Sequence, residues 1–374
     1  MGMALAEVRR SRRWPAAVAL VLLRAATSDA QPAEIGAPVS WHVVTPGVVE
    51  GQGWRDTAAA FDRLPARAEK LVREPVWGLS HDSTGLNLQF RTDATAISVR
   101  WTLNSKSLSM AHMPATGVSG VDLYVKHESR WHYLATGRAT EFPTNEAVVA
   151  SGLAGKLVEY RLYFPLYNGV AAMEIGVPEG AAFEFTTPQA KPRGAVVVYG
   201  TSITQGGCAS RPGMAYPAIL GRRLGVSVIN LGFSGNGKAE PEVAELLAEI
   251  DPAAFVLDAL PNLSTEDVAA RMPAFIEILR KRRPTTPILL VESPVYTSVP
   301  FEAENAARVA GSNDALRAIH AARLAAGDEQ IVLVPACDLS AGFGEGTVDG
   351  VHPTDLGFVQ LADSIEAYLR DALD

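Results

Sequence analysis

The feature that most constrains the fold is an alternation of strand-like and helix-like segments in the second half of the chain. The apolar runs cover residues 195–199, 226–231, 254–257, 288–291 and 331–334, and the helical segments cover residues 215–224, 241–250, 265–282, 306–325 and 353–373. Each helical segment follows an apolar run. Five β-α units in succession predict a parallel, doubly wound, five-stranded sheet with helices on both faces.

The first half of the chain has a different texture, which is typical of a β domain. Short runs rich in Val, Ile and aromatic residues are separated by Gly, Asn, Asp and Pro; they include residues 86–90, 96–101, 121–125, 131–135 and 158–164. Runs of this length and spacing predict an antiparallel sandwich, roughly a jelly roll. We therefore expect a sandwich domain over residues 31–188, a short linker, and an α/β domain over residues 192–374.

Residues 1–30 differ from both domains and have the layout of a secretory signal peptide. A basic start with four arginines precedes a short apolar core over residues 15–23, and Ser28-Asp29-Ala30 forms a small-x-Ala cleavage site. The apolar core is too short to span a bilayer, and no later segment approaches that length. The sequence thus predicts an exported protein, secreted or periplasmic in a bacterium, with no membrane span after cleavage.

Charge, histidines and cysteines limit the classes of partner. The formal net charge of -8 argues against a nucleic-acid partner, because phosphate binding needs clustered Lys and Arg. None of the seven histidines has His-Glu-x-x-His spacing and the chain has no Cys-x-x-Cys pair, so we expect no metal site. The two cysteines, Cys208 and Cys337, could form one disulfide in an exported protein, although the sequence alone does not decide their pairing.

Chemically useful side chains come directly after the predicted parallel strands. Ligands of open α/β sheets bind outside the carboxyl ends of the strands, so these positions are the candidates for a site. They hold Ser202, Gly232, Asn262, and the pair Asp349 and His352 on the loop before the last helix. A hydroxyl, backbone and side-chain amides, and an Asp-x-x-His pair are the parts of an acyl-transfer site.

Each of these residues has a role that the chemistry requires. A serine hydroxyl needs a base, which His352 would supply, while Asp349 would orient the imidazole and stabilise its charge. The amides of Ser202 and Gly232 and the side chain of Asn262 would bind the oxyanion. Taken alone, Ser202 could be a helix cap, Gly232 and Asn262 turn residues, and the Asp-His pair a surface loop. Their combination favours the catalytic interpretation.

These residues, in this order, resemble the four blocks of the SGNH (GDSL-like) hydrolases. The blocks are Gly200-Thr201-Ser202, Gly232, Asn262 and Asp349-x-x-His352, and a Gly-x-Asp-Leu-Tyr motif stands at residues 120–124. The chain is similar to the bacterial subgroup in which a β-sandwich with that motif precedes the hydrolase domain. The resemblance implies a three-layer α/β/α fold, no metal or organic cofactor, and ester hydrolysis through a covalent acyl-enzyme.

The chain departs from the family pattern at two places near the expected acyl group. Thr201 stands where the family name has Asp, and Ala259-Leu260-Pro261-Asn262-Leu263 replaces the usual Gly-x-Asn-Asp block. Neither change removes a reacting atom. Both suggest an altered pocket, so the substrate preferences of lipolytic relatives do not carry over.

The functional expectation is a secreted serine esterase acting on short O-acyl esters, with a small-molecule or polysaccharide ester of carbohydrate as substrate. The alternatives are a glycan-binding protein with an inactive hydrolase domain and a lipolytic esterase of the same mechanism. The small, apolar loop over residues 110–117 either packs on the neighbouring domain or forms a wall of the cleft. Within it, His112 and Met113 are the candidate substrate-binding residues.

Overall fold

The computed structural model describes residues 38–186, 194–341 and 343–374. The expected signal peptide and nearly all of the expected linker lie outside these ranges. Contacts group Gly36–Asp374 into one compact unit, which contains both the β part and the α/β part. Within the described residues, no helix is both long and apolar enough to cross a membrane.

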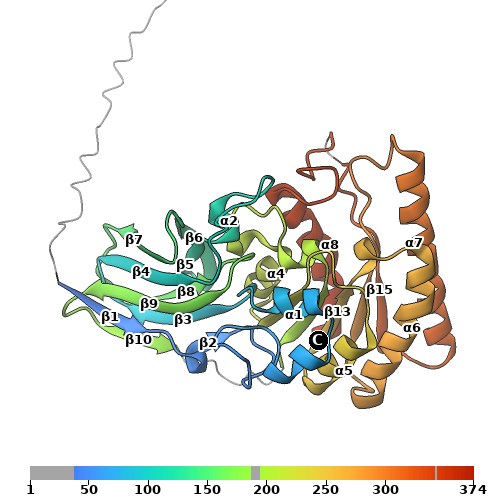
Figure 1. Ribbon diagram of the computed structural model, residues 1–374, viewed down its shortest axis with the longest axis horizontal. Helices are drawn as coiled ribbons and strands as arrows, with labels where there is room; N and C mark the ends of the chain where they lie inside the picture. The colour runs from blue at the N-terminus through green and yellow to red at the C-terminus, as the bar shows by residue number, and fades with distance from the viewer. Residues whose placement is uncertain (1–37, 187–193, 342) are drawn as a thin grey trace, which may run out of the picture. The chain divides into compact units, whose positions relative to one another are not determined.

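The β part consists of two antiparallel sheets (Figure 1). One sheet has the order β1 (Val39–Val43), β9 (Val170–Pro178), β4 (Ala96–Leu103) and β7 (Thr144–Ser151). The other has the order β10 (Phe183–Thr186), β3 (Asn87–Thr92), β8 (Val158–Tyr163), β5 (Val121–His127) and β6 (Arg130–Gly137), with β2 (Val49–Glu50) paired to β3. The chain passes back and forth between the two sheets, which is the arrangement of a jelly roll.

Alternating side chains explain how these strands enclose a core. Along β4 the odd-numbered residues Ile97, Val99, Trp101 and Leu103 are buried, whereas the residues between them are partly exposed. These side chains belong to one hydrophobic cluster that also contains residues of the facing sheet, such as Phe90. One face of each sheet therefore packs against the other, as strands of period two require.

The α/β part is built on a five-stranded parallel sheet. Its order is β12 (Val228–Gly232), β11 (Val196–Gly200), β13 (Ala254–Asp258), β14 (Ile288–Val291) and β15 (Ile331–Val334). The chain leaves β11 to one side for β12 and then returns to the other side for β13. The topological switch point, where open sheets form their crevice, is thus at the carboxyl end of β11.

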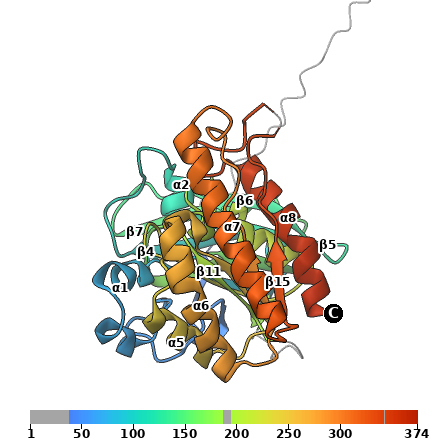
Figure 2. The ribbon, with the colours of Figure 1, turned by 90° about the vertical axis from the view of Figure 1, so that its right-hand side faces the viewer.

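Helices cover both faces of this sheet, so the expected three-layer fold is confirmed. Side chains of β11 alternate between two clusters: Val197 and Tyr199 pack with α5 (Pro241–Glu249) and α6 (Thr265–Arg282). Val196 and Val198 pack on the opposite face with α4 (Tyr216–Leu224) and α8 (Asp355–Leu373). The long helix α7 (Ala303–Ala325) packs against α6, and Figure 2 shows the two side by side.

The last helix begins two residues later than the sequence predicts. Its cap is Thr354, whose hydroxyl accepts a hydrogen bond from the Gly357 amide at 3.2 Å. A residue of this type satisfies one of the amides that the first helical turn leaves without a partner. His352 therefore lies on the loop before the helix, where its ring is free to approach the sheet edge.

One stretch of the N-terminal half packs with the α/β core instead of the jelly roll. It contains the short 3-10 helix η2 (Ala66–Lys70) and helix α1 (Glu74–Ser80), neither of which the sequence predicts. Trp54, Leu64 and Val76 belong to the same cluster as α5 and α6. The reason for the missed helices is length: α1 has seven residues, too few for a helical period to stand out.

The Gly-x-Asp-Leu-Tyr motif joins the jelly roll to the α/β part. The buried carboxylate of Asp122 accepts hydrogen bonds from Arg211 Nη1 at 2.7 Å, the Gly213 amide at 2.9 Å and the Thr136 hydroxyl at 2.7 Å. Arg211 Nη1 also donates to the Tyr124 hydroxyl at 2.7 Å. Burial raises the pKa of Asp122, and the Arg211 charge opposes that shift. The motif thus fixes the loop that comes after the Ser202 turn.

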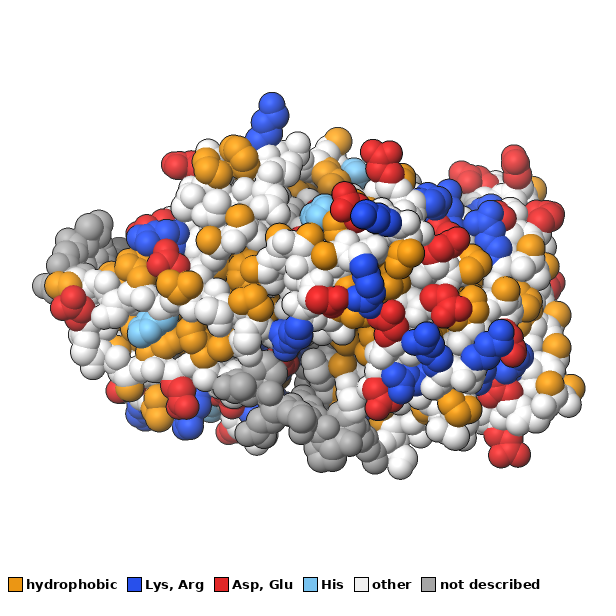
Figure 3. Space-filling view, turned by 60° about the horizontal axis from the view of Figure 1, so that its bottom comes forward, with side chains coloured by type: hydrophobic (Ala, Val, Ile, Leu, Met, Phe, Trp, Pro, Cys, Tyr) orange, Lys and Arg blue, Asp and Glu red, His pale blue; other side chains and the backbone are white. Residues whose placement is uncertain are grey.

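Charges of both signs are interspersed on the surface drawn in Figure 3. Blue and red side chains neighbour one another over the right-hand half of that view. Ion pairs such as Arg283 with Asp251, at 2.7 Å, occur among the described residues. Among the described residues drawn there, the two signs of charge alternate and do not gather into a large patch of one sign.

Candidate active site

Ser202 stands where the first parallel strand turns into a helix. The strand β11 ends at Gly200, and Thr201 caps the short helix α3 (Ser202–Gln205) by accepting from the Ile203 amide at 3.2 Å. Only glycine fits at position 200, because an added Cβ would lie 2.1 Å from Thr204 Oγ1. Ser202 is 9% exposed, so the turn leaves only a small part of this residue accessible.

His352 and Asp349 reach this serine from the loop before α8. The Ser202 hydroxyl donates to His352 Nε2 at 2.9 Å, and His352 Nδ1 lies 2.8 Å from Asp349 Oδ2. The other carboxylate oxygen of Asp349 accepts from the amides of Val351, at 3.1 Å, and His352, at 2.8 Å. The structure thus brings together all three residues of the sequence-predicted triad.

The charge state of Asp349 determines the tautomer of the histidine. Partial burial would raise the pKa of Asp349, but the amide and ring of His352 and the amide of Val351 hold it below the ordinary value. An ionised carboxylate only accepts, so Nδ1 of the neutral ring carries the proton. His352 Nε2 then has a lone pair facing the Ser202 hydroxyl, which is the geometry that general-base catalysis needs.

Gly232 does not offer the free amide that the sequence predicts for it. Its N–H already donates to Asn230 Oδ1 at 2.9 Å, and the residue is fully buried. An added Cβ would lie 2.2 Å from the Gln205 amide nitrogen, so glycine is required there for the close packing of α3 on β12. The physical reason for the correction is that Asn230 satisfies this donor, which the sequence pattern does not reveal.

Within the part of the chain that the structure describes, the amide of this loop without a protein acceptor is that of Gly235. Between residues 232 and 239, every other amide donates to a protein acceptor; the acceptors are Asn230, Gly200, Gln205, Phe233, Glu240 and Tyr199. Gly235 is exposed and has a φ of 66°, a left-handed conformation that favours glycine. Its neighbour Ser234 is tied by its amide to Gln205 of α3 at 2.9 Å. The free N–H is therefore on the loop beside the serine turn.

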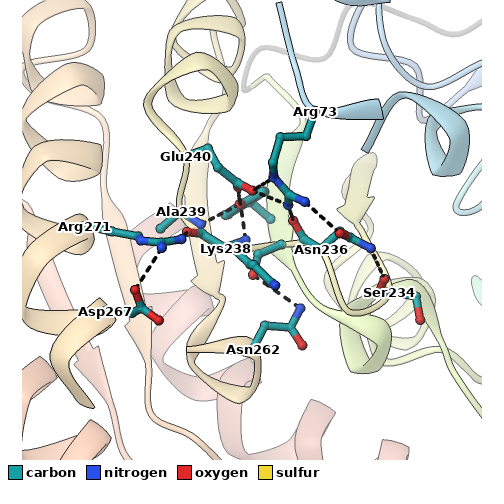
Figure 4. A network of polar contacts seen from close by, with 11 residues as sticks. Arg73, Ser234, Asn236, Lys238, Ala239, Glu240, Asn262, Asp267 and Arg271 are labelled. Carbon is teal, nitrogen blue, oxygen red and sulfur yellow. Dashed lines mark hydrogen bonds and ion pairs between the residues drawn. The ribbon is translucent and has the colours of Figure 1, made fainter. Parts of the chain in front are cut away.

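Asn262 lies in the short 3-10 helix η4 (Leu260–Asn262), directly after β13. Its side-chain amide donates to the Gly237 carbonyl at 3.4 Å, as Figure 4 shows. Gly237 in turn packs against the carbonyl of Gly200, where an added Cβ would be 1.9 Å from the oxygen. Asn262 thus lies at the carboxyl edge beside β11, and one of its two amide hydrogens remains available.

A polar network keeps the loop between β12 and α5 in place (Figure 4). Arg73, which precedes α1, donates to the side chain of Asn236 at 3.0 Å and to Glu240 at 2.8 Å. Glu240 accepts further from the Lys238 amide, and Arg271 donates to the Lys238 carbonyl at 3.3 Å. Because these contacts cross from the N-terminal half, the stretch around α1 supports the loop that carries Gly235.

The loop over residues 110–117 both packs on the α/β part and reaches the site. Met110 and Met113 pair through their backbones, so Ala111 and His112 form the tip of a tight turn. The His112 ring lies beside that of His352, with ring centroids 5.7 Å apart. Met113 is only 2% exposed and belongs to the core shared with α4 and α8. It therefore anchors the loop, and of the two substrate-binding candidates only His112 faces the site.

The two cysteines are free and buried, so the structure contains no bond between them. Cys208 lies just after the serine turn and has a φ of 73°, which is uncommon for a residue with a Cβ. Burial, and to a lesser extent the nearby Asp349 charge, raises its pKa to about 12. The thiol is accordingly neutral at physiological pH.

Two further residues at the site were not identified from the sequence. Tyr167, which comes after β8, donates its hydroxyl to the Ser202 carbonyl at 3.3 Å. The buried carboxylate of Asp258, at the end of β13, accepts from Thr204 Oγ1 and from the Tyr216 hydroxyl, each at 2.9 Å. Burial raises the pKa of Asp258 to about 7. The position of Asp258 at the end of a predicted strand could have marked it as a site residue. No pattern in the sequence distinguishes Tyr167 from the other tyrosines of the β domain.

Comparisons with known proteins identify the family. The profile of the GDSL-like lipase/acylhydrolase family matches residues 193–370, and that of the N-terminus of the SGNH-hydrolase type of esterase matches residues 39–183. A Bacteroides ovatus protein designated a GDSL-like lipase is 31% identical, with a TM-score of 0.83, over 90% of this chain and 98% of that protein. The chain therefore belongs to the GDSL-like lipase/acylhydrolase family of carboxylic ester hydrolases and carries the N-terminal domain of SGNH esterases.

More distant structures share the fold alone. The salicylyl-acyltransferase SsfX3 of a tetracycline biosynthetic pathway is 19% identical, with a TM-score of 0.69, over 88% of this chain and 97% of that one. A family two carbohydrate esterase from Cellvibrio japonicus is 12% identical, with a TM-score of 0.55, over 90% and 99% of the two chains. A comparison with curated proteins gave no match.

Proposed function

We propose that the protein is an exported serine esterase that removes short, acetyl-type acyl groups from carbohydrate. Ser202 is the nucleophile, His352 the general base and acid, and Asp349 the residue that orients the imidazole. The observation that carries this proposal is the unbroken hydrogen-bond chain from the Ser202 hydroxyl through both ring nitrogens of His352 to the Asp349 carboxylate.

The reaction proceeds in two steps. In the first, Ser202 Oγ attacks the ester carbonyl while His352 Nε2 takes its proton, and the imidazolium then protonates the departing alcohol. In the second, His352 Nε2 removes a proton from water, which attacks the acyl-serine, and the imidazolium then protonates Ser202 Oγ as the carboxylic acid leaves. His352 is neutral again after each step, and Ser202 regains its hydroxyl at the end of the second.

The oxyanion of each step needs donors beside Ser202. The amide of Ser202 opens α3 and has no acceptor among the described residues, and the amide of Gly235 is likewise free. The remaining side-chain hydrogen of Asn262 is the third donor. We assign the hole to these groups, with Gly235 in place of Gly232, and each donor is expected to contribute roughly 3 kcal/mol to transition-state binding.

The fold and the residues around the triad support carbohydrate as the alcohol part of the substrate. A jelly roll packs directly on the hydrolase part, and a family two carbohydrate esterase shares the fold of the whole chain at low identity. His112 brings a polar ring from the jelly-roll side to the triad, where it can donate to a sugar hydroxyl. Export rests on the expected signal peptide alone.

A panel of esters tests the proposal. Purified protein is assayed on p-nitrophenyl esters from acetyl to long acyl chains and on acetylated polysaccharides, with released acid as the common readout and Ser202→Ala as the blank. We expect acetyl esters to be hydrolysed fastest and acetate to be released from polysaccharide. A preference for long chains would replace the carbohydrate assignment with a lipolytic one.

Absence of turnover on every ester, without labelling of Ser202 by a fluorophosphonate, would contradict the catalytic assignment itself. In that case the glycan-binding alternative predicts measurable affinity for unmodified polysaccharide. If Ser202 is labelled but no ester of the panel is turned over, the nucleophile assignment stands and the acyl or alcohol assignment fails.

A further inference from the structure

Three metal-ligating side chains converge beside the serine, although they are far apart in the sequence. They are His112, Cys208 and His352, and one ligand atom from each lies within 4.8 Å of the other two. The expectation of no metal site rested on local spacing of His and Cys. The fold assembles these donors from three separate loops, so that spacing carries no information about them.

Each donor has a defined place in the fold. His112 lies at the tip of the turn closed by Met110 and Met113, and Cys208 comes after α3. His352 precedes the last helix, and its ring is inclined by 36° to that of His112. Cys208 is buried while His112 is exposed, so the cluster is closed on the protein side and open toward solvent.

We infer that His112, Cys208 and His352 form a binding site for a divalent transition-metal ion of the zinc type, and that occupation of this site inhibits the esterase. Two imidazoles and one thiolate are ligands that such ions prefer over the oxygen ligands of Mg²⁺ and Ca²⁺. Three protein ligands leave the fourth tetrahedral position to water. The site thus has the donor chemistry of zinc sites with one open position.

Only a small rearrangement brings the donors to bonding distance. With zinc–nitrogen and zinc–sulfur bonds of about 2.0 and 2.3 Å, ligand atoms of a tetrahedral site are roughly 3.5 Å apart. The side chain of His112 is exposed and its ring lies against that of His352, so it can turn at little cost. Asp349 stays outside the donor set because it holds His352 Nδ1.

Metal binding and catalysis compete for the same lone pair. Since His352 Nδ1 donates to Asp349, the nitrogen with a free lone pair is Nε2, which accepts from Ser202. An ion on Nε2 takes that lone pair, and Ser202 loses the base that removes its proton. The Cys208 thiol releases its proton to solvent when sulfur binds the ion. The inhibitory part of this inference rests on the proposed function, whereas the binding part does not.

Binding is tested with Co²⁺ on the whole protein, independently of activity. A thiolate bound to Co²⁺ gives a near-ultraviolet charge-transfer band, which we expect in the unmodified protein and which Zn²⁺ should abolish by competition. Cys208→Ser should remove the band, while Cys337→Ser, at the other buried free cysteine, should leave it intact. No band, or a band that survives Cys208→Ser and is lost in Cys337→Ser, would overturn the site.

Inhibition is then measured with Zn²⁺ on hydrolysis of p-nitrophenyl acetate, followed by recovery with a chelator. The concentration for half-inhibition should rise at least tenfold in Cys208→Ser and in His112→Ala, and it should not change in Cys337→Ser. His112→Ala keeps the test valid if Cys208→Ser folds poorly, because the side chain of His112 is exposed. Equal inhibition of all variants would refute the inference, whereas a cobalt band without any esterase activity would refute only the proposed function.

Discussion

The serine turn, residues 200–207, and the histidine loop, residues 347–353, present parts of one site but are held in opposite ways. Every residue of the serine turn is buried. In the histidine loop, Val348, Asp349 and Val351 are exposed, and Asp349 retains 39% of its side-chain accessibility. The turn is positioned by the core around it, whereas the loop is positioned mainly by hydrogen bonds within itself.

Side chains from several elements hold the serine turn. Below it, Asp258 accepts from Thr204, and beside it Asp82 accepts from the side chain of Gln205 at 2.9 Å. From the jelly-roll side, Tyr167 donates to the Ser202 carbonyl. Removing any of these groups should lower the free energy of unfolding, because a buried polar group that loses its partner is destabilising.

Asp349 makes several of the contacts that shape the histidine loop, beside the bond from the Val348 amide to the His352 carbonyl and the contact between the Thr347 and Thr297 hydroxyls. Asp349 accepts from two amides of its own loop and from the ring of His352, so a single carboxylate both folds the loop and orients the base. Because the serine turn is buried and most of the histidine loop is not, substitutions that alter the packing of the serine turn should lower stability as well as activity. Substitutions of polar atoms in the histidine loop should affect activity alone.

The largest effect is expected for Ser202→Ala. Removal of the nucleophile should lower kcat by about 10⁴-fold or more, since the remaining groups act only on binding and the oxyanion. Only a hydroxyl at the crevice is lost and the packing is kept, so the Tm should change by no more than about a degree or two. Kinetics and a thermal melt check both statements. Turnover within about tenfold of the unmodified protein would contradict the assignment of Ser202 as the nucleophile.

Asp349→Asn should reduce kcat by about 10²- to 10⁴-fold while leaving the Tm unchanged. The amide oxygen of asparagine can still accept from the loop amides, but its NH₂ group stabilises the wrong tautomer of His352. The matched control is Asp338→Asn, because Asp338 likewise accepts from an amide nearby, that of Ser340 at 2.9 Å. If both variants lost activity equally, a general loop defect would explain the result better than a wrong tautomer.

Gly207→Ala should have an intermediate effect that reaches both halves of the site. The new Cβ would lie 2.9 Å from the Tyr167 hydroxyl, 3.1 Å from the Ser202 carbonyl oxygen and 3.2 Å from His352 Cδ2. We expect roughly a tenfold loss of kcat and about 1 to 2 kcal/mol of stability, as overpacking usually costs. The control is Gly78→Ala, because an added Cβ at Gly78 meets nothing within 4 Å. This variant should retain full activity, so a loss in Gly207→Ala alone would be due to contacts at the site.

Asp258→Asn should have the smallest effect on activity and a distinct effect on stability. Burial raises the folded pKa of Asp258 from 3.8 to about 7, so the folded state holds a proton that the unfolded chain loses. The contribution of this group to stability is complete below pH ~3.8 and is lost as the pH rises toward 7. Asparagine stays neutral throughout, so the Tm of the variant should rise relative to the unmodified protein between about pH 4 and 8. A constant difference in Tm over that range would show that Asp258 does not titrate there.

Local patterns predicted the sheet and the three residues of the hydrogen-bond chain, which are Ser202, His352 and Asp349. The parallel strands are buried on both faces, so they read as continuous apolar runs, and the parallel order brings the residues at their carboxyl ends to one edge. That is why Ser202 could be selected without coordinates. Asp349 and His352 lie well beyond the end of the last strand at Val334, and their Asp-x-x-His spacing before the last helix was the signal that selected them. The strand-rich texture of the first half likewise predicted an antiparallel sandwich, which the pairing within the two sheets confirms.

The sequence by itself thus determined the layers of the fold and the carboxyl edge, because both depend on the periodicity of burial along the chain. It also predicted Ser202, Asp349 and His352 as a triad, and the structure brings these three residues together. The tertiary structure decided which amide is free, since the Gly232 donor is taken by Asn230 while that of Gly235 is not. It also decided that Met113 is an anchor and that His112 meets Cys208 and His352. The proximity of His112, Cys208 and His352 depends on segments far apart in the chain. The bond from Gly232 to Asn230 is local, but it needs the side-chain orientation of Asn230, whose NH₂ group donates to the distant Thr204 carbonyl.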